Sequence, residues 1–388
     1  MKRIGILMLG FLFCLAVSAW PQKKPATNII TFDVPGAGTN PGQGTLAWNI
    51  SPLGWVSGDY IDADGVYHGF LRAPDGAITK FDVLGMGTSA GQGLVEVFGM
   101  NPELEIVGDY FDSNWAYHAF IRDPRGKITA FDCPGAGPGG SAASSVSPSG
   151  VISAMYFDAN NAWHGCVRNP DGSFKLYDPP DAGLGAGQGT YNTPLDGINP
   201  EGAIVGEYWD ANWVWHTYLR SPNGHITEID APNAGSGVDS GQGTLTLGIN
   251  AAGEIWGLSI DTNYMFHGYL RSPDGTFTIV DVPNAGTGTF QGTTACWPIV
   301  CFGGINPQGT VTAGFLDGNY VMHGFLRTRE GKIVTFDAPG AGTTPGSSSS
   351  TWYQGTQPAS INPEGAISGF YTDANNVVHG FIRLPNPD

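Results

Sequence analysis

Basic residues are scarce in this sequence: 17 Lys and Arg stand against 34 Asp and Glu, which gives a net charge of −17. Nucleic-acid binding depends on basic surface that neutralises phosphates, so this balance argues against a nucleic-acid partner. Charged residues of either sign make up only 13% of the chain, whereas 59 residues are Gly. This composition is typical of short strands joined by tight turns, and it argues against a helical protein.

Long hydrophobic runs are also missing, except at the N-terminus. Residues 1–19, MKRIGILMLGFLFCLAVSA, combine a basic start with an apolar stretch, and Val17 and Ala19 suit the −3 and −1 positions of a signal-peptidase site. We therefore expect a signal peptide cleaved near Ala19, a linker over residues 20–28, and secretion to the periplasm or the extracellular space. No second run is long enough to span a membrane.

Cysteine is rare, with five residues, one of them in the predicted signal peptide. Cys296 and Cys301 lie close together in an expected loop, so in an exported protein they predict a local disulfide. Cys133 and Cys166 occupy repeat positions that other units fill with apolar side chains. We expect two buried hydrophobic residues there, with a bridge between neighbouring units as the alternative. Neither pair has the spacing to His of a zinc site, and we expect no metal and no cofactor.

A repeated pattern dominates the rest of the sequence. One His recurs seven times, each with Asp six residues before it and Arg four residues after it, and the first six also have Asp fourteen residues after them. The seven are His68, His118, His164, His216, His267, His323 and His379. The last has no following Asp, but the same motif stands alone near the start of the chain, with Asp33. The first strand is therefore expected to complete the last unit and close a ring.

Each unit has the pattern of four short strands. In the unit that begins at Gly197, the turn sequences NPEG, DANW and SPNG separate alternating apolar runs, and no helical periodicity is present. Repeats of about 50 residues with four strands predict an all-β fold, a seven-bladed β-propeller over residues 29–388 whose last blade is completed by the N-terminal strand. An open solenoid is the alternative, but it requires distinct capping units, and the sequence has none.

The hairpin between the third and fourth strands places His267 opposite Asp281, because its turn is centred on Asp274. The same register pairs every motif His with a motif Asp, and a His–Asp hydrogen bond fixes the ring tautomer and satisfies two polar groups. The predicted pairs are His68–Asp82, His118–Asp132, His164–Asp178, His216–Asp230, His267–Asp281, His323–Asp337 and His379–Asp33. A catalytic dyad is needed only once, and two residues per blade are too few for zinc, so we expect a structural role.

Function is expected where the units differ. All length variation falls between the motif Asp and the next unit's first turn, on the same face of a propeller as the tips between the second and third strands. Aromatic residues mark four tips and the two longest crossovers, and exposed aromatics on a rigid rim suit sugar rings or a protein partner. The candidates are Trp115, Trp213, Tyr264, Tyr320, Trp297, Trp352 and Tyr353. The alternative is that they cover neighbouring loops. Aromatics one position before the His, such as Trp163, are expected in the core between blades.

No motif identifies a catalytic residue. GxSxG and HExxH are absent, and acids outside the repeat, such as Glu96 and Glu207, show no evident grouping in the sequence. We therefore expect a monomeric binding or scaffold protein, with a glycan or a protein as its partner, rather than an enzyme. An extracellular polysaccharide lyase or glycosidase on the same scaffold is the first alternative, and a purely structural envelope or matrix protein is the second.

The repeat also resembles a known group of sequences. The segment INPEGAISGFYTDANNVVHGFIR, together with YHAF and the INPxG turns, resembles the probable extracellular HAF-repeat family of bacteria over nearly the whole mature chain. Two units depart from the pattern, with His-Gly-Cys at Cys166 and His-Thr-Tyr at Thr217. The resemblance implies an exported, β-rich repeat protein, and it brings no catalytic residues.

Overall fold

The computed structural model describes residues 28–385 except 239–240, 295, 298–299 and 348–352. The predicted signal peptide and nearly all of the linker therefore lie outside the described residues. Every regular element in the described part is a strand, which confirms the all-β prediction. No helix that could span a membrane occurs there.

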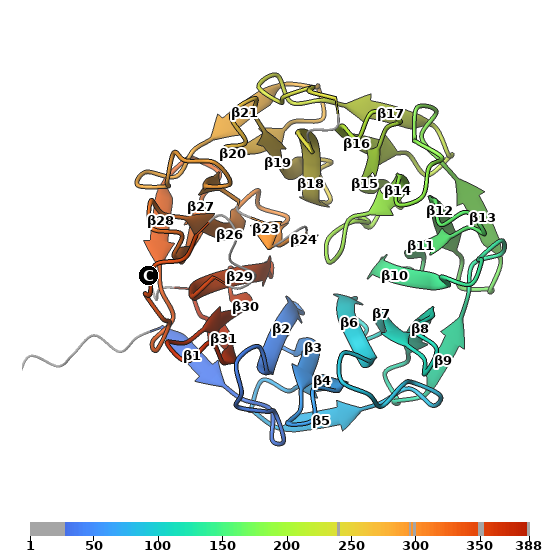
Figure 1. Ribbon diagram of the computed structural model, residues 1–388, viewed down its shortest axis with the longest axis horizontal. Coiled ribbons are helices and arrows are strands. Elements are labelled where there is room, and N and C mark those ends of the chain that lie inside the picture. The colour runs from blue at the N-terminus through green and yellow to red at the C-terminus, as the bar shows by residue number, and fades with distance from the viewer. Residues whose placement is uncertain (1–27, 239–240, 295, 298–299, 348–352, 386–388) are drawn as a thin grey trace, which may run out of the picture.

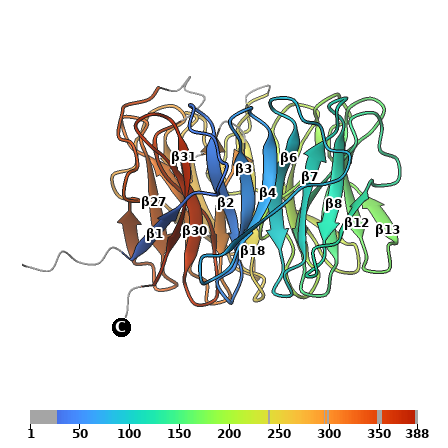
Figure 2. The same ribbon diagram turned by 90° about the horizontal axis from the view of Figure 1, so that it is seen from below.

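The strands are arranged as a ring around a central space (Figure 1). Of the described strands, 29 belong to one sheet and two form a separate hairpin. Along the chain they come in antiparallel groups, in which the first strand lies innermost and the fourth lies at the outer edge. Seen from the side, the strands cross the thickness of the ring from one face to the other (Figure 2). Each group therefore has one edge on the channel and one on the outer rim.

The bounds of the strands follow this order from the channel outwards. The innermost strands are β2 (Gly44–Ile50), β6 (Gly93–Met100), β10 (Ser141–Val146), β14 (Gly189–Asn192), β18 (Gly243–Ile249), β22 (Gly292–Thr293) with β25 (Gly303–Ile305), and β29 (Gly355–Ile361). The second strands are β3 (Val56–Ile61), β7 (Ile106–Phe111), β11 (Ile152–Phe157), β15 (Ile204–Trp209), β19 (Ile255–Ile260), β26 (Val311–Leu316) and β30 (Ile367–Thr372).

The outer half of each group holds the His motif. The third strands are β4 (Tyr67–Arg72), β8 (Tyr117–Arg122), β12 (Trp163–Arg168), β16 (Trp215–Arg220), β20 (Phe266–Arg271), β27 (Met322–Arg327) and β31 (Val378–Arg383). The outermost strands are β5 (Ile78–Phe81), β9 (Ile128–Phe131), β13 (Phe174–Tyr177), β17 (Ile226–Ile229), β21 (Phe277–Val280), β28 (Ile333–Phe336) and β1 (Ile29–Phe32). The separate hairpin consists of β23 (Cys296–Trp297) and β24 (Val300–Cys301).

Closure of the ring uses the two ends of the described chain. β1 pairs antiparallel with β31, with Ile29 opposite Arg383 and Phe32 opposite Gly380. β2 also meets β31 at Gly44, where an added Cβ would lie 1.9 Å from the carbonyl oxygen of Val378. Only Gly permits this approach, and equivalent glycines start the other innermost strands. The N-terminal strand thus completes the last group, as the register of the motif predicts.

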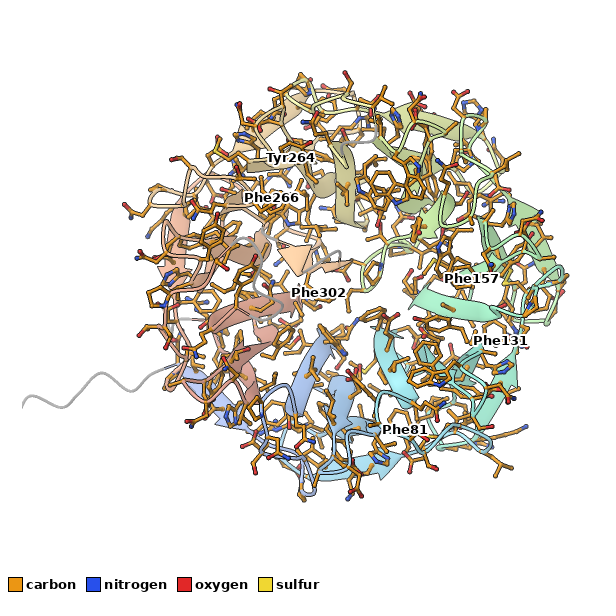
Figure 3. All side chains as sticks on the ribbon, in the orientation of Figure 1. Phe81, Phe131, Phe157, Tyr264, Phe266 and Phe302 are labelled. Atoms are coloured by element: carbon orange, nitrogen blue, oxygen red, sulfur yellow. A yellow bond between two sulfur atoms is a disulfide. The ribbon has the colours of Figure 1, made fainter. Side chains whose placement is uncertain are left out.

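Neighbouring groups of strands are joined by two kinds of contact, one at the outer rim and the other at one face of the ring. At the rim, the guanidinium carbon of Arg122 lies 5.1 Å from the ring centroid of Phe81 in the preceding group, a cation–π contact that recurs in other groups. Phe81 and Phe131 are accordingly placed towards the outside in Figure 3. At the face opposite the hairpin tips, Asn362 Nδ2 donates to the backbone oxygen of Ser51 at 3.1 Å, across the ring closure.

The disulfide prediction requires a correction. Cys133, which follows β9, is bonded to Cys166 in β12 of the next group, with a Cα–Cα distance of 6.4 Å. Both residues are buried as expected, but they form the bridge between neighbouring units that the sequence left as the alternative. The reason is that the end of one outer strand packs against the third strand of the next group, which brings two neighbouring core positions together. The backbones of Cys296 and Cys301 are paired opposite each other, but their side chains, and hence the predicted local disulfide, lie outside the described residues.

Candidate functional site

The motif His residues hold the outer part of each group together. All seven pairs have an Nδ1–Asp oxygen distance between 2.8 and 3.0 Å, including His379 with Asp33 across the closure. The Nε2 atom of each ring lies 3.3–3.9 Å from the Asp that begins the hairpin tip, six residues earlier. Each His therefore bridges two carboxylates, and we refer to these seven arrangements as the His clasps.

In the clasps of His267 and His379, the surrounding carboxylates favour the protonated ring. The hydrogen bond to Asp281 raises the pKa of His267, although partial burial of the imidazole opposes the shift. In His379, the hydrogen bond to Asp33 raises the pKa in the same way. The tip Asp also accepts from backbone amides, as in Asp62 with the N–H groups of Asp64 and Val66. These contacts tie the tip, the third strand and the outer strand of a group together, which is a structural task.

One group of ligand atoms is close enough to invite comparison with a metal site. The side chains of His216, Glu228 and Asp230 place ligand atoms within 4.8 Å of one another. Both acids are exposed, and Glu228 accepts a hydrogen bond from the Tyr208 hydroxyl. Three such groups fall short of the four-ligand set that a structural zinc takes, so we assign no metal to them.

The predicted rim aromatics are in several different environments. Trp115 is 53% exposed, whereas Trp213, Tyr264, Tyr320 and Tyr353 are partly buried. Tyr320 stacks on Tyr353 with a centroid distance of 6.2 Å, and its hydroxyl donates to a backbone oxygen of the preceding crossover. Most of these rings thus cover loops. The side chain of Trp297 and all of Trp352 lie outside the described residues.

The tip position itself is conformationally unusual. Trp115 has a φ of 64°, Trp213 of 57°, and the corresponding residue of every other tip also has a positive φ. This region favours Gly or Asn, and an aromatic residue there costs roughly 1–2 kcal/mol. Trp115 and Trp213 in turn pack edge-on against Phe111 and Trp209, with centroid distances of 5.3 and 5.4 Å. The tips are therefore continuous with aromatic residues that lie deeper in the ring.

An aromatic cluster occupies the middle of the channel. The ring centroid of Trp48 lies 4.5 Å from that of Phe302 and 5.1 Å from that of Phe370. The ring of Phe98 contacts both Trp48 and Phe302. Phe302 accordingly lies beside the central space in Figure 3. Leu195, in the segment that bends inward after β14 (Figure 1), packs against the same cluster. The four aromatic side chains come from four consecutive groups around the ring closure, and Leu195 reaches them from a fifth group.

Two adjacent cavities lie on the tip side of this cluster. The first, about 230 Å³, is lined by six aromatic residues and two acids. The aromatic residues are Phe98, Tyr117, Trp163, Tyr191, Trp209 and Trp215. The second, about 270 Å³, shares Glu96, Phe98 and Tyr117 with the first. We call the two together the channel cavity. Trp215 and Phe266 lie in a hydrophobic core cluster, as expected for this position. On this side of the ring the same position, including Trp163 and Trp215, also lines the cavity, because the third strands there reach it.

Four carboxyl groups surround the channel cavity. Glu96 and Glu207 line the first cavity, Asp59 and Glu96 line the second, and Asp109 is directly opposite Glu96 in the β6–β7 pair. The pairing is irregular on both sides of Glu96, and such bulges redirect side chains. Two ionised carboxylates opposite each other repel, so a shared proton is the favoured state of the Glu96–Asp109 pair.

Burial shifts the titration of these acids. Desolvation raises the pKa of Glu207 to about 8, although Thr193 Oγ1 donates to its Oε2 at 3.1 Å. Desolvation also raises the pKa of Asp59, against the hydrogen bond from Trp48 Nε1. For Asp109, burial and the neighbouring Glu96 both raise the pKa. The cavity therefore contains carboxyl groups that are protonated, or readily protonated, near neutral pH.

The sequence marks Glu96 and Glu207 as acids outside the repeat, but it does not predict that they gather with Asp59 and Asp109. Nine residues before each motif His, in the second strand, stand Asp59, Asp109, Met155, Glu207, Leu258, Gly314 and Phe370. Carboxylates at this position in three units, and apolar residues in four, break the repeat inside a strand. That break was a detectable signal, since acids are rarely buried without a function or a partner.

Comparisons with known proteins establish the fold and no more. The BP39L lectin from Burkholderia pseudomallei has a TM-score of 0.54 at 10% identity, with 93% of this chain and 97% of that chain covered. Puromycin hydrolase has a TM-score of 0.50 at 13% identity, with 86% and 50% covered. TolB from Acinetobacter baumannii has a TM-score of 0.44 at 14% identity, with 77% and 64% covered. The ring is thus a β-propeller.

Two further findings limit what the comparisons contribute. This chain spans about half of the puromycin hydrolase chain and 64% of the TolB chain. No protein-family model matches the sequence. No curated protein matches it either. Function therefore has to be argued from the channel cavity itself.

Proposed function

We propose that this protein is a secreted seven-bladed β-propeller that binds a glycan in the channel cavity. The single observation that carries the proposal is the lining of that cavity, in which aromatic faces and carboxyl oxygens alternate around one space. Aromatic rings stack on the apolar faces of sugar rings, and carboxyl groups bind hydroxyls. The fold shared with a lectin agrees with this use, although the fold alone decides nothing.

Export and blade number belong to the same proposal. The Cys133–Cys166 bond suits an oxidising compartment, which supports the predicted signal peptide and a periplasmic or extracellular location. Seven His clasps, each in its own antiparallel group of four strands, support the count of seven blades. Membership of the HAF-repeat family stays part of this proposal. Mass analysis of the exported protein, expected to begin after Ala19, tests the location.

Binding is tested with a glycan array followed by titration calorimetry on the best ligand. Trp163→Ala and Tyr191→Ala, which remove aromatic faces from the channel cavity, are expected to weaken binding at least about tenfold, or 1.4 kcal/mol. Leu53→Ala, at an exposed turn on the opposite face, is the control and keeps full affinity. Trp115→Ala separates a rim site from a cavity site. Binding that depends on Trp115 and not on Trp163 would move the site to the tips, and no binding to any glycan refutes the proposal.

A glycosidase is the second candidate, and one observation favours it. Glu207 is a carboxylic acid whose pKa of about 8 keeps it protonated at neutral pH, as a general acid requires, and the Glu96–Asp109 pair lies on the same cavity. Release of new reducing ends from the bound glycan, abolished in Glu207→Gln, would establish catalysis. Binding without any release after prolonged incubation leaves the protein a binder.

A further inference from the structure

The charge of the channel cavity is one-sided. Of the described residues that line it, none is Lys, Arg or His, while Asp59, Glu96 and Glu207 are acids. The groups that act on the Glu207 carboxyl are the Thr193 hydroxyl and a backbone amide, and none of them is a cation. For Asp59 they are the Trp48 indole, a backbone amide and another acid. The positive side of an ion pair is therefore missing.

Buried carboxyl oxygens of Asp59 and Asp109 have no hydrogen bond inside the described protein, and Asp59 is the one of these two residues that lines the cavity. Asp59 is fully buried, and its Oδ2 atom has no hydrogen bond of ordinary geometry, although the backbone amide of Val97 lies near the group. A buried carboxyl oxygen without a partner costs about 1–3 kcal/mol, and an unpaired buried charge costs more. A ligand that brings a positive hydrogen-bond donor into this cavity removes that cost.

The aromatic part of the lining favours the same kind of ligand. The ring centroids of Trp163 and Tyr191 are 5.0 Å apart, and those of Trp209 and Trp215 are 3.8 Å apart. Several aromatic rings therefore gather beside the acids. Ring faces attract cations, and Trp does so most strongly. A carboxylate or sulfate on the ligand would instead find no cation in the lining and would face electron-rich rings. The lining thus selects by charge as well as by shape.

We infer that the glycan bound in the channel cavity is an amino sugar polymer, whose protonated amino group lies among Asp59, Glu96 and Glu207 while its rings stack on the aromatic lining. This inference rests on the proposed glycan binding and names the class of glycan. The ammonium group stabilises the ionised form of these acids, which release their protons to solvent and form ion pairs with it, whereas an acidic glycan, such as one rich in uronic acids, finds no cation in the lining. The amino group replaces the cation that the protein does not supply.

The test uses three ligands that differ at one substituent. Tetramers of glucosamine, N-acetylglucosamine and glucose, all joined by the same linkage, carry an ammonium, an amide or a hydroxyl at the same carbon. Their affinities are measured by titration calorimetry in about 0.15 M salt, which screens long-range attraction to the acidic surface. The expected result is that the glucosamine tetramer binds at least about tenfold more tightly than the other two.

Matched variants show where the preference arises. Glu96→Gln with Glu207→Gln removes two acids from the cavity at nearly constant volume, and the preference for the ammonium ligand should disappear. Glu201→Gln with Glu364→Gln removes the same charge from exposed turns on the opposite face and should leave the preference intact. If the cavity variant does not fold, the affinities of the three tetramers for the wild-type protein still test the preference for the ammonium ligand.

Each result has a definite consequence. Equal binding of the glucosamine and glucose tetramers overturns the inference and leaves glycan binding in place. A preference that survives in the cavity variant also overturns it, because the attraction then comes from elsewhere on the acidic surface. If no tetramer binds and no glycan on the array binds either, the proposed function fails together with the inference.

Discussion

The seven units have the same side-chain contacts in the outer part of the ring, but they have different side chains on the wall of its channel. In the outer part, all seven units place a His between two Asp residues with nearly the same distances. On the channel wall, the position nine residues before the His ranges from Asp59 and Glu207 to Leu258 and Phe370. Uniform contacts hold the ring together, whereas unequal side chains make one side of the channel acidic and aromatic. In a repeat protein, a binding site is therefore to be sought where the repeat fails.

The largest expected effect comes from breaking the uniform part at its closure. Deletion of residues 27–36 removes β1 and the Asp33 partner of His379, and leaves β31 as an open edge. We expect a loss of at least ~3 kcal/mol in unfolding free energy, since buried contacts and hydrogen bonds are lost together. Thermal melting measures it, with deletion of residues 20–26 as the control. An unchanged melting temperature would contradict closure by the N-terminal strand.

The disulfide is a place where the outer part of the described ring is unequal. Replacement of Cys133 and Cys166 by Ala removes a cross-link between residues 33 positions apart, and should cost about 3–4 kcal/mol by its loop length. Urea unfolding with and without reductant measures the effect. The double variant should lose most of its response to reductant. Any response that remains reports on the predicted Cys296–Cys301 bond, and an unaltered urea midpoint would show that the bond does not form.

The pH dependence of stability separates the two regions. Glu207 binds its proton more tightly in the folded protein, where its pKa is about 8. Its contribution to the free energy of unfolding is therefore present at low pH, and it is lost as pH rises from the pKa of the unfolded chain towards 8. In the clasps of His267 and His379 the pKa of the imidazole is also raised, so their contribution to stability is lost in the same direction as pH rises through the folded pKa. The melting temperature should therefore fall from about pH 5 to about pH 8.5.

One variant shows how much of this fall in melting temperature comes from Glu207 on the channel wall and how much from the His clasps. Glu207→Gln removes the contribution of the wall acid and should flatten the profile, without abolishing the part that the His clasps cause. Melting curves of the variant and the wild type across the same pH range provide the comparison. A wild-type melting temperature that rises with pH, or an equal slope in both proteins, would show that Glu207 is not buried as described.

The smallest expected effect is the loss of one clasp. His267→Asn removes the bond to Asp281 and should lower the unfolding free energy by about 1 kcal/mol, since the other six clasps remain. Glycan affinity should not change, because His267 lies outside the channel cavity. The opposite pattern is expected for Trp163→Ala, with a large loss of affinity. A clasp variant that folds normally but loses the glycan would remove the distinction between the two regions.

Much of the framework could be predicted because its signals are local and repeated. Turn residues, alternation of apolar side chains and the constant spacing of His and Asp placed the strands, the clasps and the closing strand at Asp33. The channel cavity could not be predicted in this way. Glu96 and Glu207 are far apart in the chain, and only the ring brings their strands to one space. The Cys133–Cys166 bond was only the alternative prediction for the same reason, since it joins neighbouring groups.

The sequence by itself determined an all-β ring of repeated units, its closure by the first strand, and the pairing of each His with its Asp, because each depends on contacts within one unit or its exact copy. Only the tertiary structure decided which unequal residues face one another. It placed Tyr117, Trp163 and Trp215, which were expected in the core, in the lining of a cavity as well, and gathered four acids around it. The physical reason is that convergence on a central channel depends on the geometry of the whole ring, which no local pattern records.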